Sequence, residues 1–152
     1  MVNFKMSVKA AVALLIVGAS LSSCAKKVVE ESTDPVETTE IVGDWEIENI
    51  VIDDTTYVRP SEITPDVTQS ISFGSDSLFS ASTNCNIVGG QYILNGDSIV
   101  FSNFMSTRMA CENEDVERSL MQVLPQINTI DVLNDTVLRL NSSSEAYILL
   151  KK

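Results

Sequence analysis

The sequence contains no histidine, and it has fewer than half as many basic residues as acidic ones. Its 152 residues include 10 Lys and Arg against 21 Asp and Glu, which gives a formal net charge of −11. Without histidine, a Ser-His-Asp triad, a Cys-His nucleophile pair and an HExxH zinc helix are all impossible. The acidic excess argues against the clustered basic surface that nucleic-acid binding needs. We therefore expect no nucleic acid among the partners.

Cysteine is also scarce, with only Cys24, Cys85 and Cys111 in the chain. A closed zinc site needs four ligands, usually Cys or His, and three scattered cysteines cannot supply them. Gly89-Gly90 lacks the GxGxxG or GxxxxGK[ST] frame of a phosphate-binding loop. The sequence predicts neither a metal nor a cofactor, and its length allows one domain.

The first 23 residues have the pattern of a secretory signal. Lys5 and Lys9 provide a positive start, and residues 10–21 form an uncharged apolar run that is too short to span a bilayer. The segment Leu21-Ser22-Ser23-Cys24 resembles a bacterial lipobox, in which the Cys24 thiol is acylated and becomes the first mature residue. The alternative is an ordinary secretory signal followed by a chance cysteine.

The lipobox interpretation predicts a protein of the bacterial cell envelope, held at the membrane by lipid on Cys24. Residue 25 is Ala rather than Asp, which by resemblance to known sorting rules indicates the outer membrane, on its periplasmic or surface face. Cleavage removes two lysines and changes the formal charge from −11 to −13, so the lipid rather than the domain surface should hold the protein at anionic membranes. Residues 24–40 are polar and lack apolar periodicity, so we expect a lipidated flexible tether rather than a docked strand through Val28 and Val29.

From Ile41 onward, short apolar runs alternate with turn signals, which predicts an antiparallel β domain over residues 41–152. Asn95-Gly96-Asp97 marks a hairpin, because Asn and Gly both tolerate positive φ, and Asn134-Asp135 marks a second one. The predicted strands are residues 43–52, 70–73, 78–81, 91–94, 98–101, 128–133, 136–140 and 145–150.

One segment breaks this pattern, because residues 112–124 place apolar side chains on one face at helical spacing. Asn113 is expected to cap this helix, with Glu117 near its positive end, and Pro125 to stop it. The predicted fold class is α+β, with a curved antiparallel sheet or cracked small β-barrel and one inserted α-helix.

Two cysteine-containing segments stand out: residues 83–92 (TNCNIVGGQY) and residues 105–111 (MSTRMAC). Together with Gly43-Asp44-Trp45, they resemble the META domain family, the family of the HslJ-type heat-shock lipoproteins. The residues that match or lie within its motifs are Gly43, Trp45, Cys85, Asn86, Gly90, Tyr92, Thr107, Arg108, Met109 and Cys111. Asn84 stands where the family often has Gly, and we expect it to tolerate a left-handed backbone. Ile87 stands where the family often has a basic residue.

The resemblance implies a small α+β domain, a cracked antiparallel barrel of the bacterial envelope without established enzymatic activity. Members of the family are loosely associated with stress or drug tolerance. The leading expectation is a non-enzymatic, lipid-anchored protein that supports envelope integrity or stress and drug tolerance by binding an unknown envelope protein. The alternative is a carrier of a small apolar ligand in a cracked-barrel cavity.

Four sets of side chains keep alternatives open. Cys85 and Cys111 form a structural disulfide, remain inert thiols or act as a redox pair, and we favour the disulfide. Thr107, Arg108 and Met109 form a recognition patch or, as we favour, Thr107 and Met109 fix the chain that leads into the helix while Arg108 pairs with an acidic residue. The remaining candidates are carboxylates for general acid–base or calcium chemistry, favoured instead as a solvated face, and aromatic residues that fill the barrel or line a cavity. The carboxylates are Asp53, Asp54, Glu112, Glu114 and Asp115, and the aromatic residues are Trp45, Phe73, Phe79, Tyr92, Phe101 and Phe104.

Overall fold

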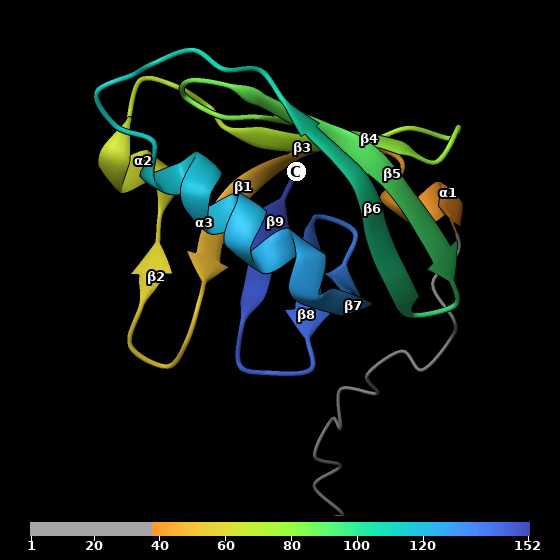
Figure 1. The fold of residues 1–152 in the computed structure, drawn as a ribbon. Helices are drawn as coiled ribbons and strands as arrows, with labels where there is room; N and C mark the ends of the chain where they lie inside the picture. The colour runs from red at the N-terminus through yellow and green to blue at the C-terminus, as the bar shows by residue number, and fades with distance from the viewer. Residues whose placement is uncertain (1–37) are drawn as a thin grey trace, which may run out of the picture. The chain divides into compact units, whose positions relative to one another are not determined.

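Eight antiparallel strands form a small barrel within residues 38–152, the part of the chain that the computed structural model describes (Figure 1). The barrel strands are β1 (Gly43–Val51), β3 (Ser70–Phe73), β4 (Leu78–Ser82), β5 (Ile87–Asn95), β6 (Ser98–Ser106), β7 (Ile127–Asn134), β8 (Val137–Ser142) and β9 (Tyr147–Lys151). The short strand β2 (Tyr57–Val58) pairs with the end of β1. The helices are α1 (Thr38–Ile41), α2 (Pro60–Ile63), α3 (Asp115–Val123) and the 3₁₀ turn η1 (Leu124–Gln126).

The barrel strands follow one another in sequence order, and β1 pairs with β9 to close the circle. Neighbouring strands pair along most of their length, with one exception. Strands β6 and β7 share a single register pair, Ser98 with Thr129, beside a hydrogen bond from Ile130 N to Asp97 O of 2.8 Å. The barrel is therefore cracked along the rest of the β6 edge.

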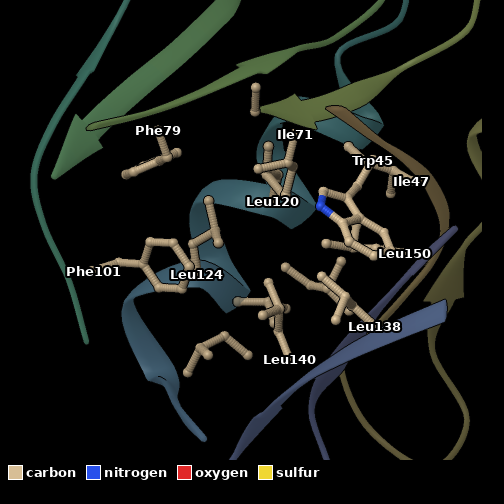
Figure 2. Packing of buried hydrophobic residues seen from close by; sticks show 14 of the residues in the cluster. Trp45, Ile47, Ile71, Phe79, Phe101, Leu120, Leu124, Leu138, Leu140 and Leu150 are labelled. Carbon is tan, nitrogen blue, oxygen red and sulfur yellow. The ribbon is translucent and has the colours of Figure 1, made fainter. Parts of the chain in front are cut away.

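Side chains fill the interior of the barrel, as Figure 2 shows. Trp45 and Ile47 alternate with exposed or half-buried residues on β1, which is the period-two pattern of a strand with one face in the core. Leu120 of α3 and Leu124 of η1 lie among core side chains from both halves of the barrel, and both are completely buried. The helical segment thus contributes a wall of the core where the strands do not meet.

The predicted hairpins at residues 95–97 and 134–135 are confirmed, as is the end of the α-helix before Pro125. Strands β5 and β6 are longer than predicted, because the sheet continues through Gly89-Gly90 and as far as Ser106. The helix begins at Asp115 rather than residue 112, and the predicted cap is wrong. Glu114 occupies the N-cap position, and Asn113, one residue earlier, accepts at Oδ1 a hydrogen bond from Asp115 N (2.9 Å), the first N–H of the helix.

The fold-class prediction is confirmed in part. The molecule is a small antiparallel barrel with one short inserted helix, but it is largely β, since α3 is the only described helix longer than four residues. The expectations for residues 1–37, including the signal segment, lipidation of Cys24 and most of the tether, lie outside the described residues. None of the helices between Thr38 and Lys152 is long and apolar enough to cross a bilayer.

Candidate functional site

The two motif segments meet at one end of the barrel, where residues 83–87 lie beside residues 106–111; we call this region the motif corner. Cys85 and Cys111 form a disulfide there, with a Cα–Cα distance of 6.0 Å. This confirms the favoured expectation and removes the alternative of two inert thiols. Cys85 is 8% exposed and Cys111 is exposed, so the bridge runs from the core edge to the surface.

The side chain of Asn86 organises the motif corner. Its Oδ1 accepts hydrogen bonds from Thr107 Oγ1 and Met109 N, both at 2.8 Å. Its Nδ2 donates to Met109 O (3.2 Å) and to Glu117 Oε2 (2.7 Å). Because the amide of Asn86 is 4% exposed and uses both its donor and its acceptor, it holds the Thr107 side chain and the Met109 backbone in place on the two sides of Arg108.

Glu117 joins α3 to this arrangement, and sequence reasoning missed the contact. Its Oε1 accepts a hydrogen bond from Ser106 Oγ (2.9 Å) while Oε2 accepts from Asn86. The sequence shows only an acidic residue in the first turn of a helix, where it complements the helix dipole. The packing of the helix against the end of β6 gives the carboxylate its second role.

A tight turn presents Asn86 to the second motif. Thr83 Oγ1 accepts hydrogen bonds from Asn86 N (2.9 Å) and Cys85 N (3.2 Å), and it donates to Asn86 O (2.8 Å). The turn does not require a left-handed backbone at Asn84, because the φ of this residue is not positive. Its Nδ2 instead donates to Asn113 O (2.9 Å), which ties the turn to the segment before α3.

The other motif residues lie away from the motif corner and support the fold. A Cβ on Gly90 would lie 2.6 Å from Ser102 O and 2.7 Å from the Phe79 ring, so this position has no room for a side chain. Trp45 Nε1 donates to Ile41 O (2.7 Å) from within the core. Gly43 begins β1 with a φ of +123°, a conformation that favours glycine.

Tyr92 is a further structural motif residue. Its hydroxyl donates to Gly74 O (2.7 Å), and its ring packs edge-on against Phe73 with centroids 5.3 Å apart. Burial, with a smaller contribution from the negative charge of Asp76, raises the pKa of the Tyr92 hydroxyl above its ordinary value. Phe79 and Phe101 also pack edge to face, at 5.1 Å. These rings fill the barrel rather than line a cavity.

A shallow depression of about 280 Å³ lies over the motif corner. It is lined by Asn86, residues 107–110, Glu114 and Glu117. Arg108 and Met109 lie exposed on its rim, and Met109 is 60% exposed. The expected pairing of Arg108 with an acidic residue is wrong for the part of the chain that the structure describes, where Arg108 forms no ion pair. The depression thus combines a fixed backbone with two accessible side chains, one cationic and one apolar.

The carboxylate candidates do not assemble into a catalytic pair at this depression. Asp53 lies in the turn after β1, where hydrogen bonds from Thr55 and Thr56 lower the pKa of its carboxyl. Asp115 pairs with Arg118 on the exposed side of α3 (2.8 Å). Within residues 38–152, no group of three or more acidic or cysteine side chains is arranged to hold a metal ion. These positions fit a solvated acidic surface.

The profile of the META domain family matches residues 38–152. Among curated proteins, none matches the chain. The fold is similar to an NMR structure of a protein from Burkholderia xenovorans, with 17% identity, a TM-score of 0.61 and coverage of 90% of this chain and 97% of that one. It is also similar to the crystal structure of a DUF4847 family protein from Bacteroides vulgatus, with 15% identity, a TM-score of 0.54 and coverage of 73% and 92%.

A further NMR structure is 21% identical, with a TM-score of 0.53, and the match covers 76% of this chain and 94% of that one. At these identities the solved structures support the fold alone. The family profile covers the barrel, the motif corner and α3 together. The chain therefore belongs to the META domain family.

Proposed function

We propose that this protein is a lipid-anchored, non-enzymatic component of the bacterial envelope that supports envelope integrity or stress and drug tolerance by binding another protein. The anchor is the lipid on Cys24, and the outer membrane is the proposed location. The observation that carries the binding role is the rigid presentation of Arg108 and Met109, whose flanking backbone is fixed by Asn86 and by the disulfide.

Rigid presentation favours binding because a prearranged surface loses less conformational entropy when a partner docks. Arg and Met are both enriched in protein interfaces, and the exposed guanidinium has no competing ion pair within the described chain. Catalysis finds less support, because Asn86 and Glu117 spend their polar atoms on holding the backbone. The packed interior likewise favours a binding surface over carriage of an apolar ligand.

A complementation experiment tests this function. A deletion strain should be more sensitive to heat or antibiotics, and the wild-type chain should restore tolerance. The variant Arg108→Glu with Met109→Asp should fail to restore tolerance although its melting temperature stays near that of the wild type, because neither side chain is buried. Leu133→Asp, at an exposed site on β7, is the matched control and should restore tolerance.

The anchor is tested separately by incorporation of labelled palmitate, which Cys24→Ser should abolish. Full restoration of tolerance by the Arg108→Glu, Met109→Asp variant would contradict the binding role. Unchanged tolerance in the deletion strain would contradict the proposed function as a whole.

A further inference from the structure

Four neighbouring strands of this acidic barrel carry no charged side chain. The outward-facing side chains of β3, β4, β5 and β6 form a surface that we call the neutral face. Its exposed members include Leu78, Ile87, Gln91, Ile93, Val100 and Met105. By contrast, β1 alone presents Asp44, Glu46 and Glu48 outward. A chain with a net charge of −11 thus has one broad surface where a second acidic molecule would meet little repulsion.

Large apolar side chains stand at both ends of the neutral face. Ile93 on β5 and Val100 on β6 lie directly opposite each other and are 66% and 52% exposed. Near the other end, Met105 lies opposite Gly89 and is 68% exposed, while the neighbouring Ile87 is 53% exposed. Exposed apolar groups gathered on one face of a soluble domain mark an interaction surface.

Carboxylates of β1 border the β3 edge of the neutral face, where Asp44 and Glu46 lie opposite Ser72 and Ser70 and Ser72 Oγ donates a hydrogen bond to Asp44. Beyond the two ends of β5 and β6, by contrast, the bordering charges are of opposite sign. Asp97 is exposed in the turn between β5 and β6, beside the Ile93–Val100 pair, and Asp76 is exposed in the nearby turn between β3 and β4. Arg108 follows the far end of β6, beyond Met105 and Ile87. It forms no ion pair within the described chain.

We propose that the neutral face binds a second copy of this chain, packed face to face with its β5–β6 hairpin antiparallel to the first. In this arrangement Ile93 and Val100 of each copy meet Ile87 and Met105 of the other. Asp97 of each copy then lies near Arg108 of the other, so the two ends pair twice around a two-fold axis. A two-fold interface requires this kind of self-complementary patch, and packed sheets bury such side chains in a layer of about 10 Å.

This inference rests on the proposed function and names its partner, because Arg108 of the motif corner takes part in the contact. We choose a second copy as the partner because its neutral face has the same length and the same uncharged, partly apolar character as the first. An acidic partner surface would pair with Arg108, but Asp97 and Asp76 would repel it.

Crosslinking in intact cells tests the contact with the full chain. A photo-activatable side chain at Gln91, in the middle of the neutral face, should give a product of twice the chain mass. The same group at Leu133, which is 50% exposed on β7, should not. Val100→Lys should abolish the Gln91 product, and Leu133→Lys should leave it unchanged.

A charge exchange tests the antiparallel arrangement. By sedimentation of the full chain in detergent, Asp97→Arg should raise the dimer dissociation constant about tenfold or more, because two arginines then meet at each end. Adding Arg108→Asp should return the constant to within about threefold of the wild type. A second change that weakens the dimer further would overturn the arrangement.

The outcomes also separate this inference from the proposed function. A Gln91 product that contains a different envelope protein overturns the second copy but leaves the binding role standing. A monomer without any Gln91 product overturns the second copy, and the complementation by the Arg108→Glu, Met109→Asp variant then decides the binding role by itself.

Discussion

The two edges of β6 are held in different ways. Toward β5, backbone pairing runs from Asn95–Ser98 to Val88–Ser106 with one irregularity at Gly90. Toward β7, the strands meet at one register pair, and Leu124 of η1 packs beside Phe101 of β6, while Leu120 of α3 lies deeper in the core near Ile71 and Trp45 (Figure 2). The paired edge requires close backbone approach and glycine, whereas the open edge depends on buried apolar volume and on the clamps of the motif corner. Motif residues serve both edges: Gly90 allows the close approach of β5 and β6, and Asn86 and the disulfide hold the segment that leaves β6.

Removal of the buried volume at the open edge should have the largest effect. Leu120 is completely buried, so Leu120→Ala should lower the free energy of unfolding by about 2–5 kcal/mol through lost burial and a residual cavity. Urea unfolding monitored by Trp45 fluorescence measures the change. Leu133→Ala, at an exposed leucine, should stay within about 0.5 kcal/mol of the wild type. A similar cost at both sites would contradict the role of α3 as a wall of the core.

Loss of the covalent clamp should come next. The disulfide closes a separation of 26 residues, so replacing Cys85 and Cys111 together by serine should cost about 3 kcal/mol on the chain-entropy estimate. Urea unfolding of this variant, with and without reductant, provides the measurement. Reduction of the wild type should produce the same loss, and the variant should be insensitive to reductant. If reduction leaves the wild type as stable as before, hydrogen bonds alone hold the motif corner.

A single methyl group tests the paired edge. Gly90→Ala should cost about 1–3 kcal/mol, since the new Cβ would collide with Ser102 O and the Phe79 ring. Gly89→Ala is the matched control, because its nearest contact would be an ordinary 3.4 Å to Phe79 O. Thermal unfolding of both variants gives the comparison. Equal losses would mean that glycine serves strand flexibility here rather than close approach.

The smallest effect concerns Tyr92 and depends on pH. Tyr92→Phe should cost about 1 kcal/mol near neutral pH through loss of the hydrogen bond to Gly74 O. Because the folded pKa of this hydroxyl is raised, the folded state retains its proton longer than the unfolded state does. Stability from this group is therefore complete below the ordinary tyrosine pKa near 10 and declines as the pH rises through the folded pKa.

Urea unfolding should be measured between about pH 8 and pH 11, a range that brackets the ordinary tyrosine pKa. Over this range Tyr92→Phe should lose less stability than the wild type. Parallel curves for the two proteins would assign the alkaline loss to other groups.

Local signals predicted much of the barrel. The hairpin at Asn95-Gly96-Asp97 was readable because its turn chemistry is local. The start of β5 was not readable, because the pair Gly89-Gly90 is typical of a loop. In the folded chain, Gly90 lies within a strand because Phe79 and Ser102 approach it too closely for a side chain. The two-residue strand β2 carries too short a pattern to be recognised.

The site divides in the same way. Family resemblance pointed to Asn86 and Cys85, but the contact of Asn86 with Glu117 spans 31 residues and depends on how α3 docks. The start of the helix was misplaced because Asn113 forms a turn with Asp115 that resembles a cap in sequence. Contacts between segments that are distant in sequence leave no periodic pattern along the chain, so they could not be predicted from the sequence.

The pairing of β1 with β9 has a consequence for how this chain reaches its folded state. Glu46 of β1 lies opposite Lys151 of β9, so the barrel closes only when its first and last strands pair. Such distant contacts slow folding to roughly milliseconds to seconds, since the chain loses loop entropy before it gains the pairing. A nascent chain would expose the β9-facing edge of β1 until β9 emerged from the ribosome, so the barrel closes only after nearly all of it has been synthesised.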